Sequence, residues 1–265
     1  MLEWSTGYGI AISDGSKGRF GIIEKNHLDE CVRKSIDGHA GVQIIVNQNM
    51  ITNHGNIGIE FIPNSKKGLV SDSVITNNII SNKPGVRDTF AIRDACAEID
   101  DLKLPGTGIR TLIESNQISM FWNEYTRRCG GIYIESRENY DLLDARILKN
   151  TISIERVDKK TGVYQGFKPS ALGINRVGSY LHSCRVTDNT ITFSPDVNLN
   201  PKQFYWLDAR GIIYFLCKHN NIIVTDTKYK FADILVSIDW PQIKTGDVND
   251  NKVIIGFQAL PSPIS

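Results

Sequence analysis

The chain lacks several features that would place it in a familiar protein class. It has no excess of one charge, since 30 Lys and Arg residues face 29 Asp and Glu residues, a formal net charge of +1. This balance disfavours a protein that binds nucleic acid or an anionic membrane surface. Its five cysteines form no CxxC or CxxH spacing, so neither a disulfide framework nor a zinc site is indicated, and reduced thiols are favoured.

Long hydrophobic runs and familiar catalytic motifs are also missing. No stretch approaches ~18 consecutive apolar residues, and the first residues show no basic start followed by an apolar run, so neither a membrane span nor a signal peptide is expected. The sequence contains no HExxH, GxSxG, P-loop or GxGxxG motif. We therefore expect no metal and no cofactor.

The composition predicts a folded chain. With 41% hydrophobic and 22% charged residues, the chain is neither disordered nor a coiled coil. A length of 265 residues suits one all-β domain over residues 1–265.

A repeat runs through the whole chain. The pattern apolar-x-x-Asn-x-apolar occurs eight times, with successive asparagines separated by 23, 29, 38, 34, 39, 31 and 31 residues. The repeated asparagines are Asn26, Asn49, Asn78, Asn116, Asn150, Asn189, Asn220 and Asn251. Most repeats carry an upstream strand-like segment, such as GIEF at Gly58 and GIYI at Gly131. Short strands that bury apolar residues only by stacking on the next repeat form a solenoid.

The predicted fold class is therefore all-β, a single-stranded parallel β-helix of about eight coils with loop insertions. Asparagine tolerates the left-handed conformation, and its amide can bond to the neighbouring coil. The repeat thus predicts an asparagine ladder at one corner of the solenoid. Cys217 takes the place of Ile or Val in its repeat, which predicts a core residue.

The GIxI strands followed by xxNxI corners resemble the right-handed parallel β-helix repeats of pectate-lyase-like proteins and bacteriophage tailspikes, over nearly the whole chain. Polygalacturonases are rejected, because only Asp100-Asp101 and His54-Gly55 imitate their motifs, in the reverse order. Extracellular pectate lyases would add a signal peptide and clustered calcium-binding aspartates, and neither is found. Tailspikes fit best by elimination.

The resemblance to tailspikes implies a chain that is synthesised in the host cytoplasm, assembles into the virion tail with other tail components, and acts extracellularly on a bacterial surface polysaccharide. It also implies a homotrimer, and the outward positions of Ile213 and Leu235 suggest subunit contact near the C-terminal end. No head-binding or trimer-closing segment is evident. We therefore expect a fragment, a split subunit or an excised domain of a larger spike.

Loops and outward positions locate the candidate site. Loops are predicted at residues 82–110, 119–130, 135–146, 155–171 and 194–208, because long coils must carry their excess there. In GIxI strands the isoleucines point inward and the residue between them points outward. The predicted outward residues are Ala11, Glu60, Arg93, Tyr133, Asn175, Ile213 and Leu235.

Glycoside hydrolysis requires two carboxyl groups, about 5 Å apart for retention and about 6.5–9.5 Å apart for inversion. Glu60, Asp94 and Glu135 on successive coils are the catalytic candidates. We expect Asp94 and Glu135 near the shorter separation and Glu60 with Asp94 or Glu135 near the longer one. We expect Gln or Asn in their place to leave stability unaffected. For lyase chemistry, the alternative, Arg93 would neutralise a uronate and Tyr133 would transfer the proton.

Substrate binding is assigned to Arg93, Tyr133 and Asn175 on the outward row and to Trp122 and Tyr125, whose rings suit stacking on sugars. Trp206 offers the same chemistry. Arg176, with Arg127 and Arg128, suits an acidic polysaccharide. The competing interpretations are that the aromatic rings pack against the solenoid wall, and that the charges form a solvated surface. The second function hypothesis is a non-catalytic receptor-binding or structural spike segment.

Overall fold

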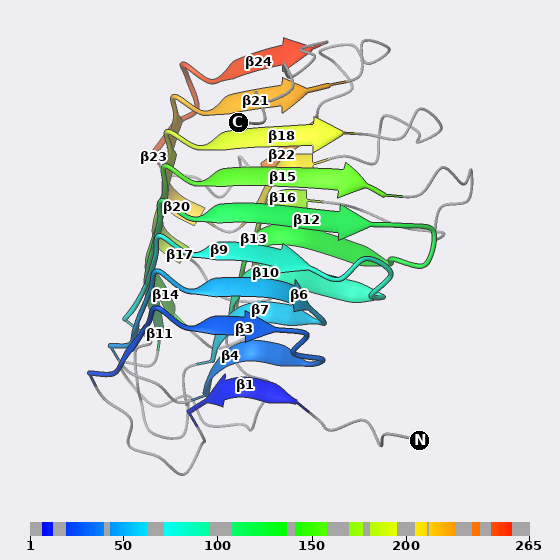
Figure 1. Cartoon of the computed structure of the whole chain (residues 1–265). Coiled ribbons are helices and arrows are strands. Elements are labelled where there is room, and N and C mark those ends of the chain that lie inside the picture. Colours follow the sequence, from blue (N-terminus) through cyan, green and yellow to red (C-terminus); the bar gives the residue numbers. More distant parts are fainter. Residues whose placement is uncertain are drawn as a thin grey trace.

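The structure is a computed structural model that describes residues 7–12, 20–39, 43–62, 72–95, 108–136, 141–157, 170–176, 181–194, 205–210, 212–225, 235–238 and 245–255. These residues form three eight-stranded sheets in which all neighbouring strands are parallel. The chain visits the three sheets in turn, so one strand from each sheet makes one coil (Figure 1). The predicted parallel β-helix of eight coils is confirmed.

The first sheet contains β1 (Tyr8–Ala11), β4 (Lys34–His39), β7 (Ile57–Ile62), β10 (Asp88–Ala95), β13 (Arg128–Ser136), β16 (Ser170–Arg176), β19 (Tyr205–Ala209) and β22 (Leu235–Ile238). The second contains β2 (Ile22–Glu24), β5 (Ile45–Asn47), β8 (Ser73–Thr76), β11 (Gly108–Glu114), β14 (Asp141–Leu148), β17 (Leu181–Thr187), β20 (Ile212–Lys218) and β23 (Thr245–Asp247). The third contains β3 (His27–Asp29), β6 (Met50–His54), β9 (Ile79–Asn82), β12 (Gln117–Trp122), β15 (Thr151–Arg156), β18 (Thr190–Ser194), β21 (Asn221–Val224) and β24 (Lys252–Ile255).

Stacks of β-branched residues fill the interior. In each sheet the inward side chains of one coil pack on the same positions of the next coil, as Ile59 and Ile92 do in the first sheet and Ile75 and Ile113 do in the second, all with no exposed area. Cys217 belongs to this core, as predicted, and is fully buried. Within the described ranges, no helix is long and apolar enough to cross a membrane.

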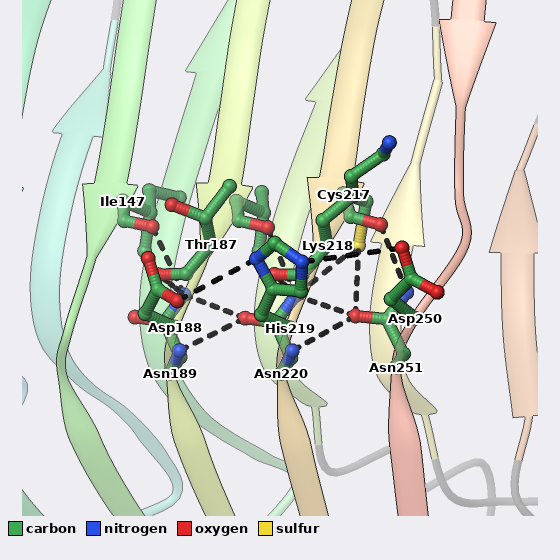
Figure 2. A network of polar contacts seen from close by, with 11 residues as sticks. Ile147, Thr187, Asp188, Asn189, Cys217, Lys218, His219, Asn220, Asp250 and Asn251 are labelled. Carbon is green, nitrogen blue, oxygen red and sulfur yellow. Dashed lines mark hydrogen bonds and ion pairs between the residues drawn. The ribbon is translucent and has the colours of Figure 1, made fainter.

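The predicted asparagine ladder lies at the corner between the second and third sheets (Figure 2). From Asn26 to Asn220, the backbone N–H of each repeated asparagine donates to the side-chain oxygen of the next, at 2.9–3.0 Å. We expected the left-handed conformation at the asparagines, but the residue before each one adopts it, for example Ser115 with φ 59° and His219 with φ 56°. The asparagine side chain is thereby free to bond along the stack.

One predicted loop proves to be mostly strand. Residues 119–130 were expected to form a loop, but β12 continues to Trp122 and β13 begins at Arg128. A turn closed by a hydrogen bond from the Thr126 N–H to the Asn123 carbonyl joins them. The backbone N–H of Arg127 donates to the carbonyl of Arg87 in the preceding coil, so the two turns stack. The predicted loops at 82–110 and 135–146 also contain strands, and the rest of the predicted loop segments lies largely outside the described residues.

Candidate functional site

Three of the predicted outward residues lie next to one another on the first sheet. Glu60 is in register with Arg93, and Arg93 with Tyr133, so the three side chains come from consecutive coils. Asp37 precedes Glu60 in this row, and Gly173 and Asp208 follow Tyr133. We call these six positions the outer row of the first sheet. Asn175 does not belong to it, because it is in register with Glu135, and Ile213 does not, because β20 lies in the second sheet.

Glu60 is on the outer row but is hidden from solvent, with 1% of its area exposed. The ammonium group of Lys34 contacts its Oε2, and Arg93 Nη1 donates to its Oε1 at 3.1 Å. Lys34 also pairs with Asp37 at 3.2 Å, so two positive and two negative charges compensate one another. Glu60 therefore belongs to a buried ion-pair cluster, and a polysaccharide on the surface cannot reach its carboxylate.

Asp94 points into the solenoid. It is in register with the core residues Phe61 and Ile134, and none of its area is exposed. Ser73 Oγ donates to its Oδ2 at 3.1 Å and lies 2.9 Å from Thr111 Oγ1. Burial raises the pKa of this carboxyl to about 7, opposed by the bonds from Ser73 and Thr111. Because Glu60 and Asp94 lie on opposite faces of one sheet, they do not form the carboxylate pair that we expected.

The remaining polar candidates are placed by their backbone alone. Glu135 is in register with Asn175, and Ser136 with Arg176, on neighbouring strands. The side chains of these four residues lie outside the described part of the structure, as do those of Ile213 and Leu235. Their predicted roles therefore stay predictions.

Two of the three aromatic candidates are buried. Trp122 ends β12 with no exposed area, and the guanidinium carbon of Arg156 lies 4.9 Å above its ring, while Trp206 is 3% exposed in the core. Their rings pack inside the wall and offer no face to a sugar, which corrects the stacking role predicted for them. Tyr125, in the turn before β13, is 63% exposed. Its ring remains accessible to a ligand.

Arg127 and Arg128, which follow this turn, differ in their surroundings. Arg127 forms two contacts with Asp88, one of them at 2.9 Å from Nε to Oδ1. Arg128 is exposed. Tyr133 packs beside Phe90, with ring centroids 5.1 Å apart, and its ring covers Gly173, where a Cβ would lie 2.3 Å from the ring carbons. Gly173 therefore gives Tyr133 its place on the outer row.

An accessible charged site lies on the second sheet, and none of the site residues predicted from the sequence belongs to it. A groove of about 150 Å³ crosses β8, β11 and β14. Its charged lining residues are Asp72, Arg110, Asp144 and Arg146. Arg110 Nε forms an ion pair with Asp72 Oδ1 at 3.1 Å, and Arg146 Nε donates to Asp144 Oδ2 at 2.7 Å. Both arginine side chains are more than half exposed, so the groove is open to solvent.

These residues form regular rows along the solenoid axis. Arg110 is in register with Asp144, and Asp144 with Ser183, which is followed by Tyr214 on β20. Ser73 is in register with Thr111, so Asp72 occupies the start of the same row. We call Asp72, Arg110, Asp144, Ser183 and Tyr214 the groove row. The alternation of strands such as GIRTLIE and DLLDARIL contains this signal, but the GIxI pattern alone does not.

The groove row places two carboxylates on either side of one guanidinium. Asp72 and Asp144 are two strand steps apart, which corresponds to ~9.6 Å between their backbones. Ser183 Oγ donates to Asp144 Oδ1, so this carboxylate is held from two sides. Among the described residues, no group of three His, Cys, Asp or Glu side chains is arranged to hold a metal ion.

Comparisons of the chain with protein-family models, with curated proteins and with solved structures find no match.

Proposed function

We propose that this β-helix binds a bacterial surface polysaccharide in the groove of the second sheet and hydrolyses it with Asp72 and Asp144. The observation that carries the proposal is the row Asp72–Arg110–Asp144, which sets two accessible carboxylates on both sides of a guanidinium in an open groove. Two strand steps, ~9.6 Å at the backbone, lie next to the ~6.5–9.5 Å carboxyl separation of inverting glycosidases.

The roles follow from the chemistry of glycoside hydrolysis. One carboxyl group donates a proton to the leaving oxygen, and the other activates a water molecule on the opposite face of the sugar. Arg110, between them, is the donor for sugar hydroxyl or carboxylate oxygens. Tyr214, 53% exposed at the far end of the groove row, offers a flat apolar face for a sugar ring.

The wider setting of the proposal comes from the resemblance of the repeats to those of tailspikes. The chain would act as part of a homotrimeric spike in the virion tail and outside the host cell. The parallel β-helix supports this setting at the level of the fold, which many unrelated functions share.

A second candidate function is glycan binding without cleavage. Asp72 and Asp144 each form an ion pair with an arginine of the same surface. Such closed ion pairs also suit a surface that only holds sugar hydroxyl groups.

The test is incubation of the purified chain with capsular, O-antigen and exopolysaccharides, followed by mass spectrometry of the soluble products. Masses that include an added water indicate hydrolysis, and unsaturated masses indicate a lyase. We expect Asp72→Asn and Asp144→Asn each to reduce product formation at least a hundredfold. Binding without products would leave glycan binding as the function.

Asp208→Asn is the matched control for Asp144→Asn. Asp208 accepts from Arg210 two residues later at 3.2 Å, as Asp144 accepts from Arg146, and the two carboxylates are about equally exposed. Asp208, however, belongs to the outer row of the first sheet. Loss of activity in the Asp208 variant but not in the Asp144 variant would move the site to the first sheet.

A further inference from the structure

Two arginines lie side by side at the edge of the groove. Arg146 on β14 is in register with Arg185 on β17, so their backbones are one strand step, ~4.8 Å, apart. Both arginines are exposed. They point away from the core, because Ala145 and Cys184, the residues directly before them on their strands, are buried. Like charges directly opposite each other on neighbouring strands destabilise a sheet.

Three other cations on or beside this face of the solenoid are each neutralised by an acid. Arg110 pairs with Asp72, Lys149 with Glu114 and Lys218 with Asp247, each across neighbouring coils. Arg185 differs from them, since it has no carboxylate partner among the described residues. Arg146 uses only its Nε on Asp144, which leaves the end of its guanidinium for another acceptor.

We infer that Arg146 and Arg185 form a subsite for an anionic group, a carboxylate or a sulfate, on a sugar of the bound polysaccharide. Two guanidinium groups present the paired N–H donors that planar or tetrahedral oxyanions accept. The anion also removes the repulsion between the two arginines, which gives the ligand a free-energy advantage over a neutral sugar.

The surroundings fit a charged sugar and not a free ion alone. Tyr214 is exposed on β20, the strand next to Arg185, and Ser183, in the same row as Tyr214, lies two residues before Arg185. A sugar stacked on Tyr214 would turn its acidic group towards Arg185. From Asp72 to Tyr214 the groove row spans four strand steps, ~19 Å, a length that accommodates several sugar units.

The substrate class that follows is an acidic polysaccharide. That the anionic group belongs to a polysaccharide rests on the proposed function, but the binding of acidic polymers by the two arginines has its own test. Binding is measured by isothermal titration calorimetry with polyglucuronate, dextran sulfate and neutral dextran at low salt. We expect binding of one or both acidic polymers and none of dextran. Preference for polyglucuronate assigns the subsite to carboxylates, and preference for dextran sulfate assigns it to sulfates.

The variants identify the two arginines. Arg185→Gln and Arg146→Gln should each weaken binding of the acidic polymer about tenfold or more, the value of one charge-assisted hydrogen bond. Arg210→Gln is the matched control, because Arg210 is 56% exposed and bonds the aspartate two residues earlier, as Arg146 does, but directly follows β19 of the first sheet. The Arg210→Gln variant should bind the acidic polymer with the same affinity as the unmodified chain.

The subsite and the proposed hydrolysis can fail separately. Equal affinity for dextran, no binding of either acidic polymer, or unchanged affinity in Arg185→Gln would overturn the subsite, even if a neutral polysaccharide is cleaved. Arginine-dependent binding of an acidic polymer without any products would instead sustain the subsite and remove the hydrolysis.

Discussion

Asn220 holds Asn189 by two hydrogen bonds across neighbouring coils. Its Oδ1 accepts from the backbone N of Asn189 at 3.0 Å and from the Nδ2 of Asn189 at 2.9 Å (Figure 2). Its own Nδ2 donates to the carbonyl of Val186 at 2.9 Å and to Asn251 Oδ1 at 2.8 Å. One fully buried side chain thus joins three consecutive coils.

We predict that Asn220→Ala lowers the free energy of unfolding by at least ~3 kcal/mol, because several buried polar groups lose their partners at ~1–3 kcal/mol each. Chemical denaturation followed by circular dichroism measures the change. Asn221→Ala is the control, since Asn221 is the next residue and is exposed. Similar losses in both variants would show that the ladder has no special contribution.

The left-handed residues before the asparagines predict a change in the opposite direction. Ser115 has φ 59° and no hydrogen bond from its side chain among the described residues. Relief of ~1–2 kcal/mol of strain by glycine exceeds its chain-entropy cost of ~0.5–1 kcal/mol. Ser115→Gly should therefore stabilise the fold by up to ~1 kcal/mol, and Ser115→Val should destabilise it. Ser119→Gly, within β12, should destabilise, and an equal effect of both glycines on the melting temperature would contradict this account.

Asp94 predicts a pH dependence of stability. Its pKa is raised in the folded state from the ordinary 3.8 to about 7, so the folded chain holds this proton more tightly than the unfolded chain. Its contribution to stability is complete below about pH 3.8 and is lost as the pH rises through about 7. The stability of Asp94→Asn relative to the unmodified chain should therefore rise between these two values and then level off. Denaturation at half-unit pH steps measures it, and a constant difference would refute the assignment.

His54 predicts the opposite slope. Burial lowers its pKa from 6.5 to about 4, so the unfolded chain takes up the proton first. The stability that neutral His54 contributes is present above about pH 6.5 and is lost as the pH falls towards about 4. His54→Gln should remove this loss, which the same denaturation series detects as a difference from the unmodified chain that grows in the acid range. A difference that does not vary with pH would show that His54 does not titrate in this way.

The buried charge cluster predicts that Glu60 acts through stability. Glu60→Gln removes the carboxylate that both Lys34 and Arg93 contact, and breaking a buried ion pair costs ~3–5 kcal/mol. We therefore expect a clear loss of thermal stability, contrary to the sequence-based expectation of none. Glu114→Gln is the control, because Glu114 pairs with Lys149 on an exposed part of the surface. A Glu60 variant that is fully stable but inactive in polysaccharide cleavage would restore Glu60 as a catalytic candidate.

The fold was accessible from the sequence because its repeat is local. Each asparagine is separated by two residues from an apolar residue before it and by one from an apolar residue after it, and this spacing alone predicted the corner, the coil count and the ladder. The alternation of inward and outward residues in the GIxI strands correctly placed Glu60, Arg93 and Tyr133 in one row. The alternation could not show that Lys34 and Arg93 form ion pairs with Glu60 and bury it, because these ion pairs join residues of different coils.

The sequence by itself determined the parallel β-helix, since β-branched residues at a fixed distance from an asparagine can be buried only by stacking. The tertiary structure alone decided which charges remain accessible. Asp94 lies on the inward face of its strand, two residues after Ile92, but only the structure shows that Ser73 Oγ donates to its carboxylate there, and that Trp122 is buried in the wall of the solenoid. Asp72, Arg110 and Asp144 share one register because each lies six residues before a repeated asparagine, but only the structure shows that Arg110 pairs with Asp72 and that the three residues line a groove.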